Sequence, residues 1–465
     1  MILLSSGLPP WGTPMGELAR AALAGTAFLV ILAIAELWQR RWASPVEWTR
    51  KFVHLAGGAV IATFPWAFRT HMTVLGLGVA MLATFAAGKR LGMLRSVTGV
   101  ERHSAGERWY PVGVYLLFVV AHHEPVFWLI GLSSLVVSDT AAALLGGAYG
   151  KHAFFAAHDR KSIEGSAAFF AATFLGVHLA LLLLTPIERG ASVLVALQIA
   201  LLVTSFEAIS LGGNDNLIVP LATYYLLVKM TPQPAASIAF QLLVQLAILC
   251  AMLVVAWRTR VLSWAGALAA HLVIYAAFSL GGPAWSVAPM AALAGFVVLD
   301  GRVASDGGRH QVEAVFWISI VGVVLIFLDN TFATLVPGGH PLGSGHPFAV
   351  PYVGALAAPA AILTYQYLRL RRSAWSRPVA SAVAVATGWL LVAPVSLAAS
   401  GIIELRAHAI VVAMCATALP LYIVARRIVR RRSETSDLRL QGLAVAIAVA
   451  VWTIVHLRMS VSGGS

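Results

Sequence analysis

The chain has few charged residues and almost no cysteine. Only 11% of its 465 residues are charged, 19 of them acidic, and the two cysteines are Cys250 and Cys415. Both cysteines lie within apolar runs, which excludes a disulfide framework and a cysteine-based metal site. The sequence also lacks HExxH, GxSxG and CxxC. It therefore carries no signature of a zinc protease, a serine hydrolase or a dithiol redox enzyme.

Apolar side chains dominate what is present. Hydrophobic residues make up 59% of the chain, and the mean hydropathy is +0.84. A soluble core needs far less apolar surface, whereas bilayer spans of about 20 residues each require it. The composition predicts an all-α polytopic integral membrane protein. The net charge of +13 comes from basic residues in short loops between apolar runs, a pattern typical of membrane topology and not of nucleic-acid binding.

The apolar runs predict about 14 to 16 transmembrane helices. In the first half they fall at 17–38, 52–68, 72–88, 110–122, 126–147, 165–184, 191–210 and 216–228. In the second half they fall at 236–257, 261–281, 284–300, 312–335, 350–370, 378–399, 405–425 and 438–457. The first 20 residues have neither a basic n-region nor a small-residue cleavage site, so we expect no removable signal peptide.

Every second loop between these runs is basic. Arg50 and Lys51 lie between the first two runs, and Lys151 and Lys161 between the fifth and sixth. The positive-inside rule then places the basic loops in the cytoplasm and both termini outside. A Pro-rich connector at 230–234 predicts a division into two membrane domains, 1–230 and 235–465.

Carboxylates inside or beside apolar runs mark the candidate site. An ionisable group at the bilayer centre costs several kcal/mol and by default marks a functional position. Four carboxylates of the first half are expected to approach the cytoplasmic side, and oxygen ligands of this kind suit a Mg²⁺ ion that bridges phosphates. The four predicted metal ligands are Asp139, Glu164, Glu207 and Asp215. Of these, Asp139, Glu164 and Asp215 are also the predicted catalytic residues.

Basic and small polar residues of the same loops are predicted to bind a nucleotide. Phosphoryl transfer requires positioning, Mg²⁺ and positive charge to offset the phosphates, and amides at a helix start can cradle phosphate. The predicted nucleotide-binding residues are Arg50, Lys51, His54, Lys151, Lys161, Ser162, Gly165, Ser166 and Asn216. The segment GGAYGK at 146–151 is not a Walker A loop, because it lacks the spacing and the Ser or Thr after Lys.

Structural roles are the alternatives for several of these residues. Asp139 and Glu207 could form helix–helix hydrogen bonds or salt bridges without any catalytic role. Arg50 and Lys51 could only set the topology. His54 could be a hydrogen-bonded interfacial histidine.

Four motifs of the first half resemble one family of membrane enzymes. They are RKFVHLAGG at 50–58, SDTAAALLGGAYGK at 138–151, KSIEGSAAFF at 161–170 and FEAISLGGNDNLIVPL at 206–221. In this order they resemble the dolichol kinase and phytol kinase family of polyprenol kinases. The resemblance implies CTP-dependent, Mg²⁺-assisted phosphorylation of a membrane-resident prenol at the cytoplasmic face. It also assigns Asp139, Glu164 and Asp215 to metal or phosphate chemistry.

Two other functions remain open from the sequence. The motifs are also similar to those of phosphatidate cytidylyltransferases, which would make a CDP-lipid, but the later signature of those enzymes is absent, and PGGHPLG at 337–343 does not replace it. A lipid transporter would use the buried carboxylates as a cation or proton site. The second half, from 263–285 onward, resembles only faintly a membrane family that includes phytyl-phosphate kinases, so its role is open between a second kinase step and a scaffold or lipid-binding groove.

Overall fold

The computed structural model describes residues 14–91, 106–156, 159–210, 212–300, 312–335, 346–371, 375–429 and 434–462. The first 13 residues, which bear on the signal-peptide prediction, and PGGHPLG at 337–343 lie outside these ranges. The chain forms two compact units, Met1–Leu243 and Val244–Ser465. The boundary between the units falls inside a helix that follows the Pro-rich connector predicted at 230–234.

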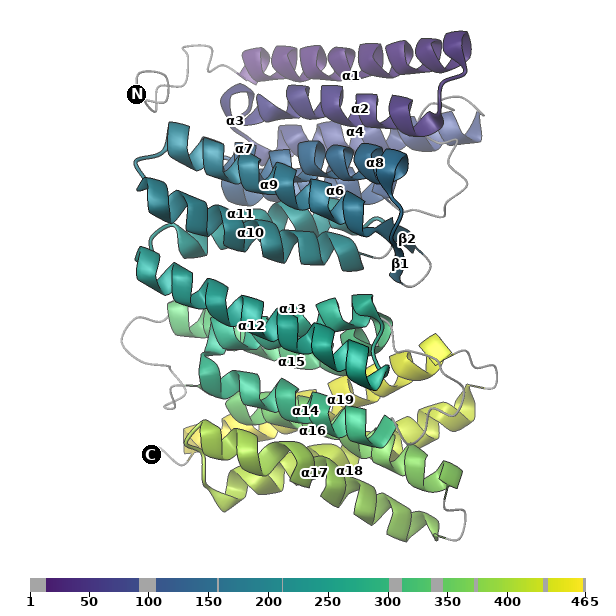
Figure 1. The fold of residues 1–465 in the computed structure, drawn as a ribbon, viewed down its shortest axis with the longest axis vertical. Helices are drawn as coiled ribbons and strands as arrows, with labels where there is room; N and C mark the ends of the chain where they lie inside the picture. The colour runs from purple at the N-terminus through teal and green to yellow at the C-terminus, as the bar shows by residue number, and fades with distance from the viewer. Residues whose placement is uncertain are drawn as a thin grey trace. The chain divides into compact units, whose positions relative to one another are not determined.

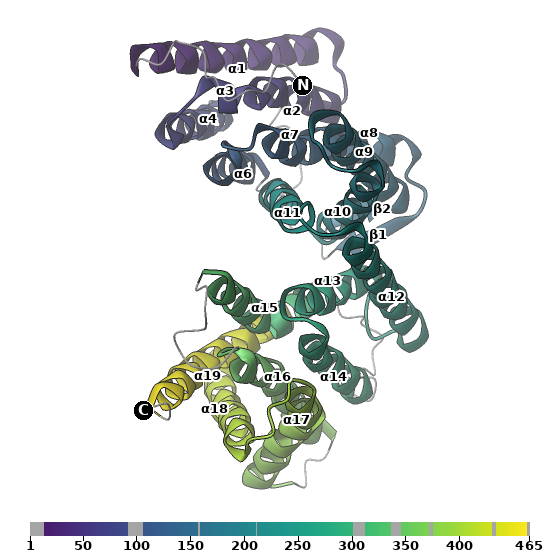
Figure 2. The same cartoon turned by 90° about the vertical axis from the view of Figure 1, so that its left-hand side faces the viewer.

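The first unit consists of antiparallel helices and one small hairpin (Figure 1). Its elements are α1 (Pro14–Trp42), α2 (Val46–Ala62), α3 (Phe64–Ala67), α4 (His71–Arg90), α6 (Gly106–Ala121), α7 (Pro125–Ser133), a π-helical turn η1 (Ser134–Ser138), α8 (Asp139–Tyr149), β1 (Ala153–Ala156), β2 (Asp159–Ser162), α9 (Ile163–Leu184), α10 (Arg189–Ile209) and α11 (Asp215–Met230). Figure 2 views α6, α10 and α11 nearly end on.

Within its described residues, the second unit is built from helices joined by short connections. Its elements are α12 (Ala235–Thr259), which begins in the first unit, α13 (Trp264–Gly281), α14 (Pro283–Asp300), α15 (Val312–Leu335), α16 (Ala349–Arg371), α17 (Arg377–Ala399), α18 (Leu405–Ile428) and α19 (Glu434–Ser462). Helices α16, α17 and α18 pack side by side (Figures 1 and 2) around a core that includes Leu356, Val392 and Met414.

The predicted all-α polytopic membrane fold is confirmed. Within the described ranges, eleven helices are long and apolar enough to cross a bilayer. This number is below the 14 to 16 spans expected from the sequence, partly because α2 has 17 residues and α6 and α11 have 16 each. The hairpin β1–β2 was predicted only as a polar loop. Its strands pair antiparallel, with Phe154 opposite Lys161.

Close helix contacts bring distant segments to one end of the first unit. A Cβ atom at Gly58 on α2 would lie 2.6 Å from Val136 Cγ1, so only glycine lets α2 rest against η1. A Cβ atom at Gly113 on α6 would lie 2.2 Å from the carbonyl oxygen of Asn216, where α11 begins. These contacts hold α2 against η1 and α6 against the start of α11.

Candidate functional site

A buried ion pair joins α2 to α8. Lys51 Nζ lies 2.5 Å from Asp139 Oδ2 and also donates to the Asp139 carbonyl oxygen at 3.3 Å. The Lys51 side chain is 2% exposed and that of Asp139 is 28% exposed. Asp139 is ten residues from the end of α8, or about 15 Å along the helix axis. A charge at this depth requires a partner, and Lys51 is that partner.

The π-helical turn η1 immediately precedes Asp139, so it adjoins the Lys51–Asp139 pair. A π turn widens the helix by one residue and often occurs at functional positions. His54 Nε2 lies 3.0 Å from the carbonyl oxygen of Leu135 in this turn and 3.4 Å from Asp139 Oδ2. The interfacial, hydrogen-bonded histidine anticipated as an alternative thus also contacts the candidate site.

A second lysine–carboxylate pair links the hairpin to α10. Lys161 Nζ donates to Glu207 Oε1 at 2.6 Å, to the Glu207 carbonyl oxygen and to Ser210 Oγ at 2.8 Å. Ser210 Oγ in turn donates to Asp215 Oδ2 at 3.2 Å. The salt bridge that the sequence allowed for Glu207 is present.

Local charge keeps Lys161 protonated. Burial alone would lower the pKa of Lys161, but the adjacent Glu207 carboxylate, assisted by Asp215, raises that pKa above its ordinary value of 10.5. Lys161 lies on β2, ahead of α9, so the hairpin holds its ammonium group beside the carboxylates.

Arg50 adds a third cation at the same end. Its guanidinium forms a two-point pair with Glu47, at 2.6 and 3.1 Å. Arg50 is also near enough to Asp139 and Asp215 for both charges to act on it. Three cations and three carboxylates from α2, α8, β2, α10 and α11 thus form one charged cluster, defined by Arg50, Lys51, Asp139, Lys161, Glu207 and Asp215.

Glu164 lies apart from this cluster in its contacts. Its carboxylate accepts hydrogen bonds from the backbone N–H of His152, at 3.2 and 3.3 Å, and lies 2.7 Å from His152 Nδ1. The contact joins the first turn of α9 to the segment before β1. Lys151, the residue before His152, is exposed.

Two predicted phosphate-binding residues have structural tasks at the start of α9. Ser162 is the N-cap, because its Oγ accepts from the Gly165 N–H at 3.1 Å. Gly165 is buried against α8, where a Cβ atom would lie 3.1 Å from the carbonyl oxygen of Ala142. Ser166, which follows, is half-buried.

The four predicted metal ligands do not form one metal-binding group. In the described part of the chain, no group of three or more His, Cys, Asp or Glu side chains is placed to hold a metal. Mg²⁺ in phosphoryl transfer, however, needs only one or two carboxylates, with waters and substrate phosphates as further ligands. Asp139 and Asp215 both belong to the charged cluster and stay the candidates for this role. Asp139 Oδ1 has no hydrogen-bond partner among the described residues.

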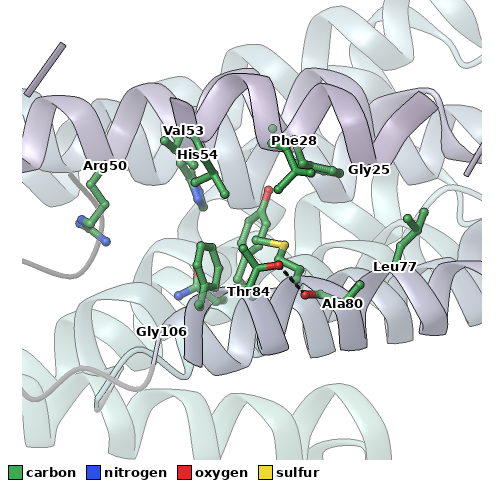
Figure 3. Close-up of a pocket in the computed structure, with 16 residues that line it drawn as sticks. Gly25, Phe28, Arg50, Val53, His54, Leu77, Ala80, Thr84 and Gly106 are labelled. Carbon is green, nitrogen blue, oxygen red and sulfur yellow. Dashed lines mark hydrogen bonds between the residues drawn. The ribbon is translucent and has the colours of Figure 1, made fainter. Parts of the chain in front are cut away.

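A largely apolar cavity adjoins the charged cluster (Figure 3). Its volume is about 210 Å³, and it lies between α1, α2, α4 and α6. Phe28 and Leu77 belong to its apolar wall, while Arg50, His54 and Asn216 also line it. One space therefore contacts both hydrocarbon side chains and predicted nucleotide-binding residues.

A comparison with known proteins identifies the family. Over 208 residues the chain is 34% identical to a phytol kinase from Synechocystis, and the match covers 43% of this chain and 87% of that protein. The chain belongs to the phytol kinase family. It is thus an enzyme of the lipid-alcohol kinase class, as the motifs predicted. No family model and no solved structure matches it.

Sequence reasoning missed several parts of the phytol kinase-like site. Glu47, His152 and Ser210 hold predicted residues in place, and of these Glu47 and His152 lie outside the four motif segments. Tyr110 lines the cavity, but an aromatic residue in an apolar run is usually a core residue. The motif segments were the signal that could have located Ser210, since it lies between Glu207 and Asp215.

Proposed function

We propose that the first unit transfers the terminal phosphate of CTP to the hydroxyl group of a membrane-resident prenol at the cytoplasmic face of the membrane. The observation that carries this proposal is the charged cluster, in which Lys51 and Lys161 are held beside Asp139 and Glu207. Family membership supplies the reaction class. The matched stretch is 43% of this chain but 87% of the relative, so a protein about half as long contains the corresponding machinery.

The reaction needs little covalent chemistry from the protein. The prenol oxygen attacks the terminal phosphorus of CTP, and a new O–P bond forms. The bond from this phosphorus to the bridging oxygen breaks, CDP leaves with that electron pair, and the hydroxyl proton passes to a carboxylate. The base would be one of the three predicted catalytic carboxylates, Asp139, Glu164 and Asp215. Catalysis then depends on positioning and on charge.

The cations of the cluster are suited to the nucleotide phosphates. Lys51 and Lys161 are each held by a carboxylate, so both are ordered before any substrate binds. Arg50 can offer a planar fork of donors to a phosphate oxygen. We assign these three residues to the triphosphate, with Lys151 at the exposed edge. Mg²⁺ held by Asp139 and Asp215 would neutralise charge on the transferring phosphate.

The distribution of basic residues supports the cytoplasmic placement. Arg40 and Arg41 end α1, Lys89 and Arg90 end α4, and Lys161 lies on the hairpin that follows α8. Consecutive helices run in opposite directions, so these ends share one side of the first unit. By the positive-inside rule that side faces the cytoplasm, where CTP is available.

An assay with the purified chain tests the proposal. The protein is incubated with CTP labelled in its terminal phosphate, Mg²⁺ and a twenty-carbon prenol in mixed micelles. We expect labelled prenyl phosphate and unlabelled CDP. Release of pyrophosphate with formation of a CDP-lipid would instead support a cytidylyltransferase. Nucleotide-independent lipid flux in liposomes, without any phosphorylated product, would support a transporter.

A further inference from the structure

The cavity beside the charged cluster has a polar end and an apolar end. Arg50, His54 and Asn216 line it together with Tyr110, and its remaining lining is largely hydrocarbon. In Figure 3, Arg50 lies at the left of the view, His54 next to it, and Phe28 beyond His54 on the right. This polarity matches an alcohol with a hydrocarbon chain, whose hydroxyl must reach the phosphate site.

Tyr110 has an unused hydrogen-bonding group in this place. Its side chain is 7% exposed, and its hydroxyl has no hydrogen-bond partner among the described residues. Its ring lies 4.8 Å from that of His54, centroid to centroid. A buried hydroxyl without a hydrogen-bond partner is destabilising, because it has lost its bonds to water. A ligand oxygen that pairs with it would remove this cost.

The cavity is too small for a whole prenol. An apolar cavity of about 150 Å³ accepts benzene, with six carbon atoms. By that measure, about 210 Å³ accommodates between one and two five-carbon isoprene units. The cavity is not closed on its outer side. Two of its lining residues are exposed: Leu29 on α1, which is 58% exposed, and Ala80 on α4. A longer chain can leave there into the bilayer.

We propose that this cavity binds the hydroxyl end and the first one to two isoprene units of the alcohol, that Tyr110 hydrogen-bonds to the alcohol oxygen, and that the rest of the chain lies in lipid between α1 and α4. The proposal rests on the proposed kinase function and adds the substrate-binding site. It follows that the enzyme recognises the head of a prenol and does not measure its length.

Gly25 offers a way to fill the cavity without disturbing its walls. Gly25 lines the cavity on α1, and a Cβ atom there meets only Leu77 Cδ2, at 4.0 Å, which is ordinary contact. Gly76 on α4 is the matched control, because a Cβ atom there meets nothing within 4 Å and Gly76 does not line the cavity. We expect Gly25→Leu to lower kcat/KM for a twenty-carbon prenol by about tenfold or more, with KM for CTP unchanged. Gly76→Leu should stay within about twofold of the wild type.

Tyr110→Phe separates binding from structure. Removing an unpaired hydroxyl should leave the thermal midpoint in detergent unchanged or slightly raised, while KM for the prenol rises and KM for CTP does not. An unchanged KM for the prenol, whatever the thermal midpoint, would overturn the role of Tyr110.

A series of prenols of different length, measured with the wild-type enzyme, tests the proposal without any variant. Prenols of five, ten, fifteen and twenty carbons are compared at equal mole fraction in mixed micelles. We expect kcat/KM to rise from five to ten carbons and then to stay level. A continued rise to twenty carbons, or equal activity of Gly25→Leu and Gly76→Leu, would overturn the cavity proposal while the kinase function stands. Absence of phosphorylation of every prenol by the wild type would overturn the kinase function itself.

Discussion

Lys51 and Asp139 are 88 residues apart in the sequence, yet Lys51 Nζ lies 2.5 Å from Asp139 Oδ2. The pair connects α2 to the helix that follows the π turn and places opposite charges about 15 Å from the end of that helix. Neither residue could be buried alone at reasonable cost. The pair therefore stabilises the fold and, in our account, also forms part of the phosphate site.

Removing only the cation should be costly. In Lys51→Met the partly buried carboxylate of Asp139 loses its nearest cation, and we expect a loss of up to about 3–5 kcal/mol in unfolding free energy. Thermal unfolding in detergent measures this. The double variant Lys51→Met with Asp139→Asn should recover much of the lost stability but none of the activity. A single variant as stable as the wild type would contradict the buried pair.

Lys161 should matter far more than the neighbouring Arg160. Arg160 lies on the same strand and is exposed, whereas Lys161 is held by Glu207 and Ser210. We expect Lys161→Ala to reduce kcat/KM for CTP by about a hundredfold or more, and Arg160→Ala to change it by less than about threefold. Similar losses in both variants would indicate a nonspecific effect of charge.

The raised pKa of Lys161 has a consequence for pH dependence. A lysine whose pKa is higher in the folded state contributes stability that is complete below its unfolded value, ordinarily 10.5, and that is lost as the pH rises through the folded-state value. The pair with Glu207 should thus be intact throughout neutral and mildly alkaline pH. We expect kcat/KM for CTP to show no alkaline decline centred below about pH 10. A decline centred near pH 8 that is absent in Lys161→Arg would contradict this expectation.

The contact between α8 and α9 should tolerate one glycine substitution and not the adjacent one. A Cβ atom at Gly146 would lie 3.1 Å from both Gly165 Cα and Ser162 Oγ, whereas one at Gly147 meets nothing within 4 Å. We expect Gly146→Ala to lower stability by about 1–3 kcal/mol and to reduce activity, because α9 and its N-cap must move. Gly147→Ala should be neutral or stabilising by up to about 1 kcal/mol. Equal midpoints for the two variants would argue against this packing.

Removal of metal should abolish transfer without unfolding the protein. Asp139 and Asp215 are the only carboxylates that we assign to Mg²⁺, and the remaining ligands would come from the nucleotide and water. EDTA should eliminate prenyl phosphate formation, and added Mg²⁺ should restore it, while the thermal midpoint without nucleotide changes little. A large drop in the midpoint on chelation would indicate a structural metal instead.

The sequence was sufficient for the class of fold and for the positions of the charged cluster, and the reasons are physical. Carboxylates such as Asp139 and Glu207 are conspicuous in apolar runs because burying them is expensive. Their pairing was not predictable, since it depends on close contacts such as that of Gly58 with Val136. The hairpin was missed because its strands are four residues each, and the cavity because its lining is drawn from five separate elements.

Asp139→Asn tests the central claim most directly. The substitution keeps the size and most of the hydrogen bonding of the side chain but removes its charge. Transfer of label from CTP to a twenty-carbon prenol is measured beside the thermal midpoint, with Glu36→Gln, a change in the pair with Arg40 one turn away on α1, as the control. We predict that Asp139→Asn remains folded with a lowered thermal midpoint, because Lys51 loses its anionic partner, and that it forms no detectable prenyl phosphate, while Glu36→Gln is fully active. Full activity of a folded Asp139→Asn would contradict the account.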